Sequence, residues 1–380
     1  MPTVQSTSIF ATAPDGAKSP DSITSGSGSI WVEYGNGAKS DGSAGSSTIV
    51  QYDLLGAVQS TYTLPGLADG LKVDPATGNV WALQNQDGNS TLTFIDPKTG
   101  QVSAPLSYAP PYTYGADSAR GYDDVAFVGQ KVFQSYTGPK NTGDPVIQQL
   151  TNGTAPFGLL QTTDVLRLGD TGTNLVTGET KQLLPVTDPD SLKALPDGSL
   201  ILTGEADRAF TIISNPGTTE QSAGFVALPA GSSQPDDVIR PIATSGTFYI
   251  SNQNDNDILA AKVTELNTGD LYATVGSNLD QIDPSTGVVT PILTGLNAAH
   301  GLLFSPSTLG TPDLAALLQT LSQDFYQAFA NLASSAGQTG SVGSGGATLD
   351  TPIPSAASII SLASSNASNT LAGLLPVTNG

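Results

Sequence analysis

The fold of this chain is predicted most directly from the stretch Asp69-Gly70-Leu71-Lys72-Val73-Asp74-Pro75-Ala76-Thr77-Gly78-Asn79-Val80-Trp81-Ala82-Leu83. It opens with an acidic, a small and an aliphatic residue, and two runs rich in apolar residues flank a turn. In that turn Pro75 fixes φ and Gly78 accepts a positive φ. The stretch therefore predicts two antiparallel strands, with Asp69 at the start of the first.

The opening phrase of this stretch recurs along the chain. Its six copies are Asp21-Ser22-Ile23, Asp69-Gly70-Leu71, Asp123-Asp124-Val125, Asp190-Ser191-Leu192, Asp236-Asp237-Val238 and, with His in place of Asp, His300-Gly301-Leu302. The spacings are 48, 54, 67, 46 and 64 residues. Most copies precede an aromatic or β-branched strand pattern, such as Ile30 to Tyr34 or Phe248 to Ile250. Each period is long enough for four short strands.

A chain of strand quartets joined by tight turns predicts an all-β fold, a six-bladed β-propeller with four-stranded blades. About 24 strands fit between Thr7 and Pro306. A strand near Thr7 to Ala13 is expected to complete the last blade and close the ring. Seven blades, or five with additions, remain as alternatives because the strand register from Asp257 to Pro306 is ambiguous.

Four phrases carry a resemblance to a known group of proteins. They are Leu71-Lys72-Val73-Asp74-Pro75, Phe94-Ile95-Asp96-Pro97-Lys98-Thr99-Gly100, Tyr249-Ile250-Ser251-Asn252 and Ala299-His300-Gly301-Leu302-Leu303-Phe304. Over residues 7 to 306 the chain resembles the NHL and SMP-30/gluconolactonase group of six-bladed propellers. That group includes metal-dependent lactonases, other hydrolases, lyases and non-catalytic binding modules, so the resemblance implies a fold and a choice of functions.

The pattern changes after the propeller, which is assigned residues 1–306. Residues 307–380 are predicted to form a C-terminal α-helical extension, in which Thr311 caps a one-sided amphipathic helix. A Gly/Ser-rich linker at 337–346 separates it from a second helix candidate at 355–374. The first helix is expected to pack on the propeller or to form a homo-oligomer, with secretion or anchoring as a further alternative.

Composition excludes several classes of function. The 380 residues include 33 acidic and 13 basic ones, a net charge of -20 that argues against nucleic acid as a partner. The chain has no Cys and one His, which excludes thiolate chemistry and multi-His metal sites. No 18-residue apolar stretch predicts a membrane span, and no signal peptide precedes Gly16. The low Lys content and abundant Ser, Thr, Asn and Gly favour an extracytoplasmic or secreted protein.

The repeat predicts where chemistry takes place. The first residue of every copy is expected at one mouth of the central channel, because innermost strands of successive blades start on the same face. Loops joining second to third strands emerge there too. Their polar residues are Asn85, Asp87, Glu205, Asp207, Asn252, Asn254 and Asp255. Asp74 and Asp96 belong to turns on the opposite face.

Several facing carboxylates cannot all stay ionised without a compensating charge. A divalent cation, with Ca²⁺ as the expected ion, supplies that charge because this chain offers oxygen ligands rather than thiolates or several imidazoles. The candidate ligands are Asp190, Asp236, Glu205, Asn252, Asp69 and Asp21. The alternative for each Asp is a structural role, in which its carboxylate caps neighbouring backbone N–H groups.

His300 is the only imidazole, so proton transfer by histidine near neutral pH depends on it. His300 and Asp236 are therefore the candidate catalytic residues, although a His at a strand start also serves as a hydrogen-bonded structural residue. The sequence contains no Gly-x-Ser-x-Gly elbow, P-loop or dinucleotide fingerprint. This excludes the serine hydrolases, P-loop nucleotide-binding proteins and NAD-binding proteins that carry these motifs.

A long Tyr-rich segment precedes the inner strand of the third blade and is expected to rise on the mouth face. Its candidate ligand-binding residues are Tyr108, Tyr112, Tyr114, Arg120 and Tyr122. Tyr offers apolar area with a polar tip, which suits a small molecule or a carbohydrate. The alternative is that the segment plugs the channel or covers a neighbouring blade.

Three functions follow from these observations. The resemblance implies a metal-assisted hydrolase similar to lactonases and esterases, with an Asp or His300 as general base. The second is a non-catalytic propeller that binds a carbohydrate, peptide or partner protein on the same face. The third is a structural surface protein that assembles through its C-terminal helices.

Overall fold

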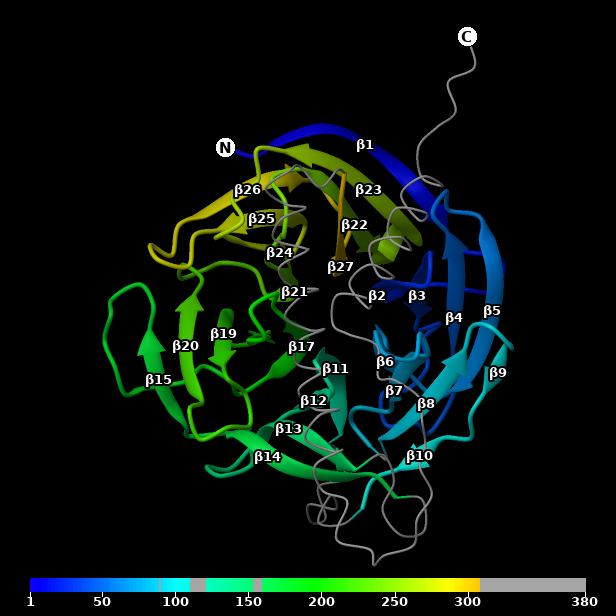
Figure 1. The fold of residues 1–380 in the computed structure, drawn as a ribbon. Coiled ribbons are helices and arrows are strands. Elements are labelled where there is room, and N and C mark those ends of the chain that lie inside the picture. Colours follow the sequence, from blue (N-terminus) through cyan, green and yellow to red (C-terminus); the bar gives the residue numbers. More distant parts are fainter. Residues whose placement is uncertain (89, 110–120, 153–158, 308–380) are drawn as a thin grey trace, which may run out of the picture. The chain divides into compact units, whose positions relative to one another are not determined.

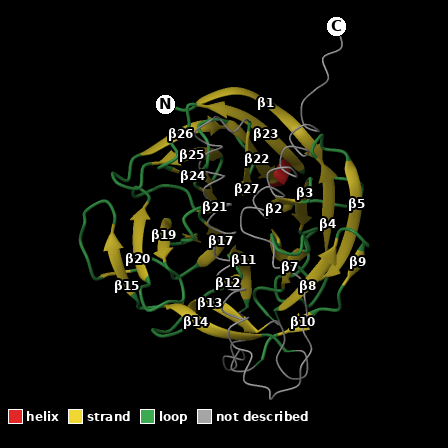
Figure 2. Cartoon of the chain, viewed as in Figure 1, coloured by secondary structure: helices red, strands yellow, loops and turns green. Residues whose placement is uncertain are grey.

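The computed structural model describes residues 1–88, 90–109, 121–152 and 159–307. These residues form six β-sheets arranged as blades around a common axis (Figure 1). Strands dominate the described residues and the only helix among them is one short 3-10 turn (Figure 2). The predicted six-bladed β-propeller is confirmed.

The first three blades follow the chain from the axis outwards. The first contains β2 (Pro20–Gly26), β3 (Ser29–Tyr34), β4 (Ser46–Asp53) and β5 (Val58–Pro65). The second contains β6 (Ala68–Val73), β7 (Val80–Gln84) and β8 (Thr91–Asp96), and both β9 (Gln101–Val102) and β10 (Leu106–Ser107) pair with β8. The third contains β11 (Tyr122–Val128), β12 (Lys131–Tyr136), β13 (Pro145–Asn152) and β14 (Gln161–Arg167).

The fourth blade is wider than its neighbours. Its regular strands are β17 (Pro189–Ala194), β18 (Leu200–Gly204), β19 (Ala209–Ser214) and β20 (Ser222–Ala227). On its outer edge β15 (Thr171–Asn174) pairs in parallel with β20, and β16 (Gln182–Leu183) pairs with β15.

The last two blades are interlaced in sequence. The fifth contains β21 (Pro235–Ile239), β24 (Leu271–Val275), β25 (Asn278–Ile282) and β26 (Val289–Thr294). The sixth contains β27 (Ala299–Pro306), β22 (Gly246–Asn252), β23 (Asp257–Thr264) and β1 (Thr3–Thr12), and η2 (Gln253–Asp255) joins β22 to β23. The Phe248 to Ile250 strand follows Asp236 in the sequence but lies in the next blade.

The reason for the interlacing is the strand that comes last. Phe248 pairs with Phe304 and Ile250 with Leu302, so β22 finds its inner partner in β27 rather than in β21. The Phe248 ring also lies 5.0 Å from the Phe304 ring, which adds aromatic packing to the ladder. This pairing resolves the register that the sequence leaves ambiguous after Asp257.

The N-terminal strand closes the ring as predicted. β1 pairs antiparallel with β23, from Thr3 opposite Thr264 to Thr12 opposite Asp257. The strand begins earlier than the expected Thr7. Because the first and last strands of the described chain share one sheet, no blade is left without its neighbours.

The core lies between blades. There are six buried apolar clusters among the described residues, and each combines residues of two neighbouring blades. One of them joins Phe133 of the third blade to Leu200 of the fourth, for example. Burial of these faces is the main source of stability, so each blade depends on the two beside it.

The predicted C-terminal helices and the 337–346 linker lie outside the described residues. Their homo-oligomeric role stays a prediction. The last described strand, β27, ends at Pro306. Within the described part of the chain, no helix has the length and apolar character needed to cross a membrane.

Candidate functional site

The recurring phrase forms a β-bulge at the start of inner strands. The register shifts between Pro20 and Ile23 in β2, and the same shift occurs in β6, β11, β17 and β21. A bulge leaves the extra residues outside the ladder and bends the strand. The two residues skipped, such as Asp21 and Ser22, therefore face the propeller axis.

The bulges enclose a small cavity of about 20 Å³ on the axis. Its lining residues are Asp21, Ser22, Asp69, Gly70, Asp123, Asp124, Asp190, Ser191, Asp236, Asp237 and Gly301. This volume accommodates one water molecule or one ion. An organic ligand is too large for the cavity and has to bind outside it, at the mouth.

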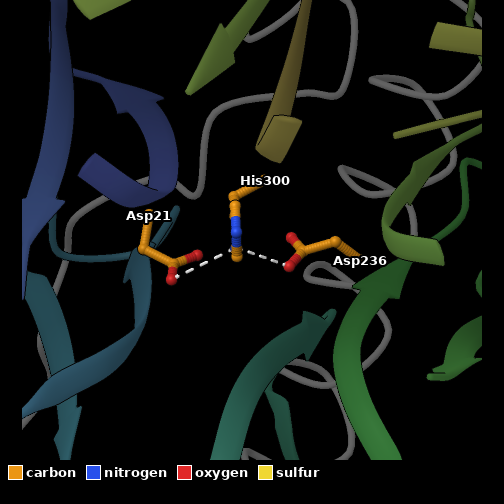
Figure 3. Close-up of side chains that lie close together, drawn as sticks. All are labelled: Asp21, Asp236 and His300. Atoms are coloured by element: carbon orange, nitrogen blue, oxygen red, sulfur yellow. Dashed lines mark ion pairs between the residues drawn. The ribbon is translucent and has the colours of Figure 1, made fainter. Parts of the chain in front are cut away.

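Three side chains from neighbouring blades meet at this mouth (Figure 3). His300 Nδ1 lies 2.7 Å from Asp236 Oδ1 and 3.5 Å from Asp21 Oδ2. Both contacts are ion pairs when the imidazole is protonated. One potential ligand atom from each residue lies within 4.8 Å of the other two, which is the spacing needed to hold a metal ion. The structure thus brings together the two candidate catalytic residues.

The charges of this trio stabilise one another. Burial lowers the pKa of His300, but the Asp21 and Asp236 carboxylates outweigh it and raise that pKa to about 12. Burial raises the pKa of Asp236 to about 7, even though the imidazolium opposes the shift. Without a metal, His300 is therefore a cation at neutral pH and is not available as a general base.

The remaining first-position acids form an arc without a histidine. Burial, followed by the charge of Asp21, raises the pKa of Asp69 to about 7. Asp123 is hydrogen-bonded to Asp69, and burial together with the Asp69 and Asp190 charges raises its pKa well above the usual range. The pKa of Asp190 is raised in the same way, by burial and then by the charge of Asp236. Burial and the neighbouring charges thus favour the protonated form of each of these three carboxyl groups.

The second-position acids have a different, structural role. Lys72 Nζ lies 2.9 Å from Asp124 Oδ2, and Lys193 pairs with Asp237. Asp124 also accepts a hydrogen bond from the backbone N–H of Leu192, and Asp237 accepts one from that of Leu302, at 2.9 and 2.7 Å. These carboxylates tie the inner strands of different blades together.

The same pairs explain the charge at the mouth. Lys72 and Lys193 are engaged by Asp124 and Asp237. Among the described residues, no Lys or Arg nitrogen forms an ion pair with Asp21, Asp69, Asp123, Asp190 or Asp236. Within the described part of the chain, His300 is thus the only cationic side chain paired with the first-position acids.

The other predicted metal ligands are dispersed around the trio. Asp69 and Asp190 line the same cavity. Glu205 is half-buried in the loop after β18; burial and the charge of Asp188 raise its pKa, and the nearby His300 charge opposes that shift. Asn252 donates to Asp255 at 2.7 Å and accepts from the backbone N–H of Asn297 at 2.7 Å. The Asn252 amide is thus engaged within its own blade and is not placed as a ligand.

Two of the candidate ligand-binding residues, Tyr108 and Tyr122, are placed in the core, and their contact with a ligand stays a prediction. Both side chains are buried, at 7% and 1% exposure, and their ring centroids lie 4.4 Å apart. Gln134 donates to the Tyr108 hydroxyl at 2.6 Å, and Tyr122 donates to Gln148. They belong to the core between the second and third blades. The other three candidates, Tyr112, Tyr114 and Arg120, lie outside the described residues.

Three residues near the mouth were missed by sequence reasoning. Gln86 donates to Asp69 Oδ2 at 2.7 Å, and Gln253 donates to Asp21 Oδ2 at 3.4 Å. Glu33 is fully buried, and burial followed by the charges of Asp21 and Asp69 raises its pKa well above the usual range. A signal existed in each case: Glu33 interrupts an apolar strand, and each Gln adjoins a polar loop residue already singled out.

Comparisons with known proteins give matches among solved structures alone. No protein-family model and no curated protein sequence matches the chain. Solved structures do: a streptogramin B lyase is 16% identical, with 75% of this chain and 72% of that chain covered and a TM-score of 0.43. The periplasmic gluconolactonase of Pseudomonas aeruginosa is 13% identical, with 76% and 89% covered and a TM-score of 0.45. The virginiamycin B lyase of Staphylococcus aureus is 12% identical, with 82% and 91% covered and a TM-score of 0.39.

The six sheets themselves define the class, that of six-bladed β-propellers, and the solved structures to which the chain is similar include a gluconolactonase and lyases. The resemblance found in the sequence is confirmed at this level. At such low identities the likeness concerns the fold. The function has to be argued from the residues of the mouth.

Proposed function

We propose that this protein is a metal-assisted hydrolase that cleaves an ester or lactone at the mouth of the propeller. The observation that carries the proposal is the trio Asp21, Asp236 and His300, whose ligand atoms lie within 4.8 Å of one another. The two aspartates of the trio belong to the first-position acids, none of which has a Lys or Arg partner among the described residues. A divalent cation compensates that charge more fully than one imidazolium does.

The three side chains of the trio suit some divalent ions better than others. Two carboxylates and one imidazole match the preferences of Mn²⁺ and Zn²⁺. Ca²⁺ takes six to eight oxygen ligands and does not favour an imidazole. The trio therefore fits Mn²⁺ or Zn²⁺ better than the Ca²⁺ expected from the sequence.

A bound ion of this kind polarises a substrate carbonyl and lowers the pKa of a coordinated water. The chain's own residues supply the rest. Asp21, Asp236 and His300 would hold the ion, and His300 would do so through a deprotonated ring nitrogen. Asp69 lines the same cavity and its pKa of about 7 suits it to take up and return a proton near neutral pH. Gln86 fixes the Asp69 carboxylate through its 2.7 Å hydrogen bond.

The test is a panel of lactones and esters assayed with metal-free protein to which Mn²⁺ or Zn²⁺ is returned. We expect turnover only with metal, and a loss of about 100-fold or more in kcat/KM in Asp236→Asn and His300→Ala. Asp197→Asn, in a turn at the other end of the blades, is the matched control and is expected to keep full activity.

Turnover that survives chelation, or that is equal in the wild type and both site variants, overturns the proposal. Metal binding without turnover of any substrate favours the alternative of a ligand-binding propeller. The extracytoplasmic location suggested by composition stays a prediction.

A further inference from the structure

A second hollow lies between the fourth and fifth blades. It measures about 550 Å³, within the range of small-molecule sites. Its lining residues are Thr173, Leu175, Asp197, Ser199, Ile212, Ser214, Ser222, Ala223, Gly224, Arg240, Pro284 and Ser285. Two adjacent blades build it, so its shape depends on their packing.

This groove is separate from the acidic mouth. β17 carries Asp190 near its first residue and reaches the Asp197 turn after its last. β21 likewise begins beside Asp236 and ends just before Arg240. At about 3.3 Å per residue, the four-residue step from Asp236 to Arg240 separates the two sites by roughly 13 Å. The groove therefore opens at the opposite end of the blades and is not a subsite of the mouth.

Arg240 is the single cationic residue of the groove lining. Its Nη1 lies 3.7 Å from Asp197 Oδ2, a long ion pair, and its Nε–H is buried without an acceptor among the described residues. Asp197 uses its other oxygen to accept the Ser199 backbone N–H at 2.9 Å. A guanidinium has five N–H donors in a planar fork, and the residues that the structure describes engage only a small part of this capacity.

The surroundings define what this guanidinium would bind. A carboxylate matches the fork of an Arg side chain and replaces its weak contact with Asp197. Five Ser and Thr side chains line the walls and can donate to and accept from ligand hydroxyls. Leu175, Ile212 and Pro284 contribute apolar surface, and no aromatic ring lines the groove for stacking on an uncharged sugar.

We propose that this groove is a second binding site, selective for a small organic carboxylate that carries several hydroxyl groups. The site is independent of the hydrolase proposed for the mouth. Its anchor is Arg240, and Asp197 competes with the ligand for that anchor.

The experiment is calorimetric titration of the full chain with D-glucuronate as the probe, and with D-glucose as its uncharged counterpart. The wild type is expected to bind glucuronate and not glucose. Arg240→Gln weakens binding by about tenfold or more, because hydrogen bonds to a charged group are lost. Asp197→Asn strengthens binding, because the competing charge is removed.

Arg240→Lys is the control for a loss of binding caused by misfolding. This variant keeps the positive charge but loses the planar fork of donors, so its affinity for glucuronate is expected to lie between those of the wild type and Arg240→Gln. The proposal is overturned if glucuronate does not bind the wild type at 10 mM, roughly the limit of specific small-ligand affinity. Equal affinity in the wild type and Arg240→Gln, or weaker binding in Asp197→Asn, also overturns it.

Discussion

Asp236 and Asp237 are neighbours in the chain, yet their pKa values move in opposite directions. Burial raises the pKa of Asp236 to about 7. Burial acts on Asp237 in the same sense, but the Lys193 and Lys72 charges and the hydrogen bonds outweigh it and lower that pKa. The difference follows from the bulge, which directs one carboxylate to the mouth and the other to the lysines. Position in the phrase therefore decides whether an acid is structural or open to a ligand.

Replacing Asp237 by Asn tests the structural role. The substitution leaves the Lys193 ammonium near the axis without its carboxylate, and we expect the free energy of unfolding to fall by about 3 kcal/mol. Urea denaturation at pH 7 measures this change. The long ion pair between the exposed Asp197 and the partly buried Arg240 is the control, and Asp197→Asn is expected to change stability by less than about 0.5 kcal/mol. Equal effects of the two variants would refute the structural role of Asp237.

Part of the site could be predicted at this scale. The repeat places the first residue of each copy at the same point of successive blades. That position is enough to predict that Asp21, Asp236 and His300 converge. The ion pairs of Lys72 and Lys193 could also be predicted. Each lysine directly follows a copy of the phrase, and the next copy along the chain reads Asp-Asp-Val. The burial of Tyr108 and Tyr122 was not predictable, because tyrosine suits a core and a binding surface equally well.

At the scale of elements, the inner strands approach one another closely at the bulges. A Cβ on Gly301 of β27 would lie 2.3 Å from the backbone oxygen of Asp21 in β2, and one on Gly70 would lie 2.3 Å from that of Asp123 in β11. Both contacts are with backbone, which has little room to shift. Glycine in the phrase is therefore a packing requirement between neighbouring blades.

We accordingly expect Gly301→Ala to destabilise the protein by about 1–3 kcal/mol, as overpacking does, and to displace Asp21 from His300. Thermal unfolding gives the first effect, and loss of metal affinity reports the second. The matched control is Gly269→Ala, where the added Cβ has its nearest neighbour at 3.5 Å, an ordinary contact. A Gly301 variant as stable as the Gly269 variant would contradict the packing argument.

The order of strands was predictable where pairing is local. In the first four blades each inner strand pairs with the strand that follows it, so the phrase and the next strand pattern suffice. The fifth blade breaks this rule, because β22 and β23 pass into the sixth sheet before β24 returns to β21. Local pattern does not distinguish β22 from β24; only the distant partners β27 and β1 do.

At the scale of the whole molecule, part of the net charge of -20 is concentrated at the mouth of the propeller. Several acids converge on one mouth, where folding raises their pKa values. A carboxyl group whose pKa is higher in the folded than in the unfolded state binds more protons when folded, so stability falls as pH rises between the two pKa values. His300, raised from an ordinary value to about 12, acts in the same direction above pH 6.5.

The chelator-treated protein is therefore expected to be less stable at pH 8 than at pH 5. Each unit of pKa difference titrated in that window contributes about 1.4 kcal/mol. Urea unfolding at the two pH values measures the change, and addition of Mn²⁺ at pH 8 is expected to restore stability because the ion binds the folded state. Stability that is unchanged or higher at pH 8 without metal would contradict this account of the mouth.

The central claim is that Asp21, Asp236 and His300 hold a divalent cation, and calorimetric titration of the metal-free protein with Mn²⁺ and Zn²⁺ at pH 7 tests it most directly. We predict one ion per chain, release of protons on binding, and affinity weaker by about tenfold or more in Asp236→Asn and His300→Ala. Binding of neither ion to the wild type, or equal affinity in the wild type and both variants, would contradict the claim.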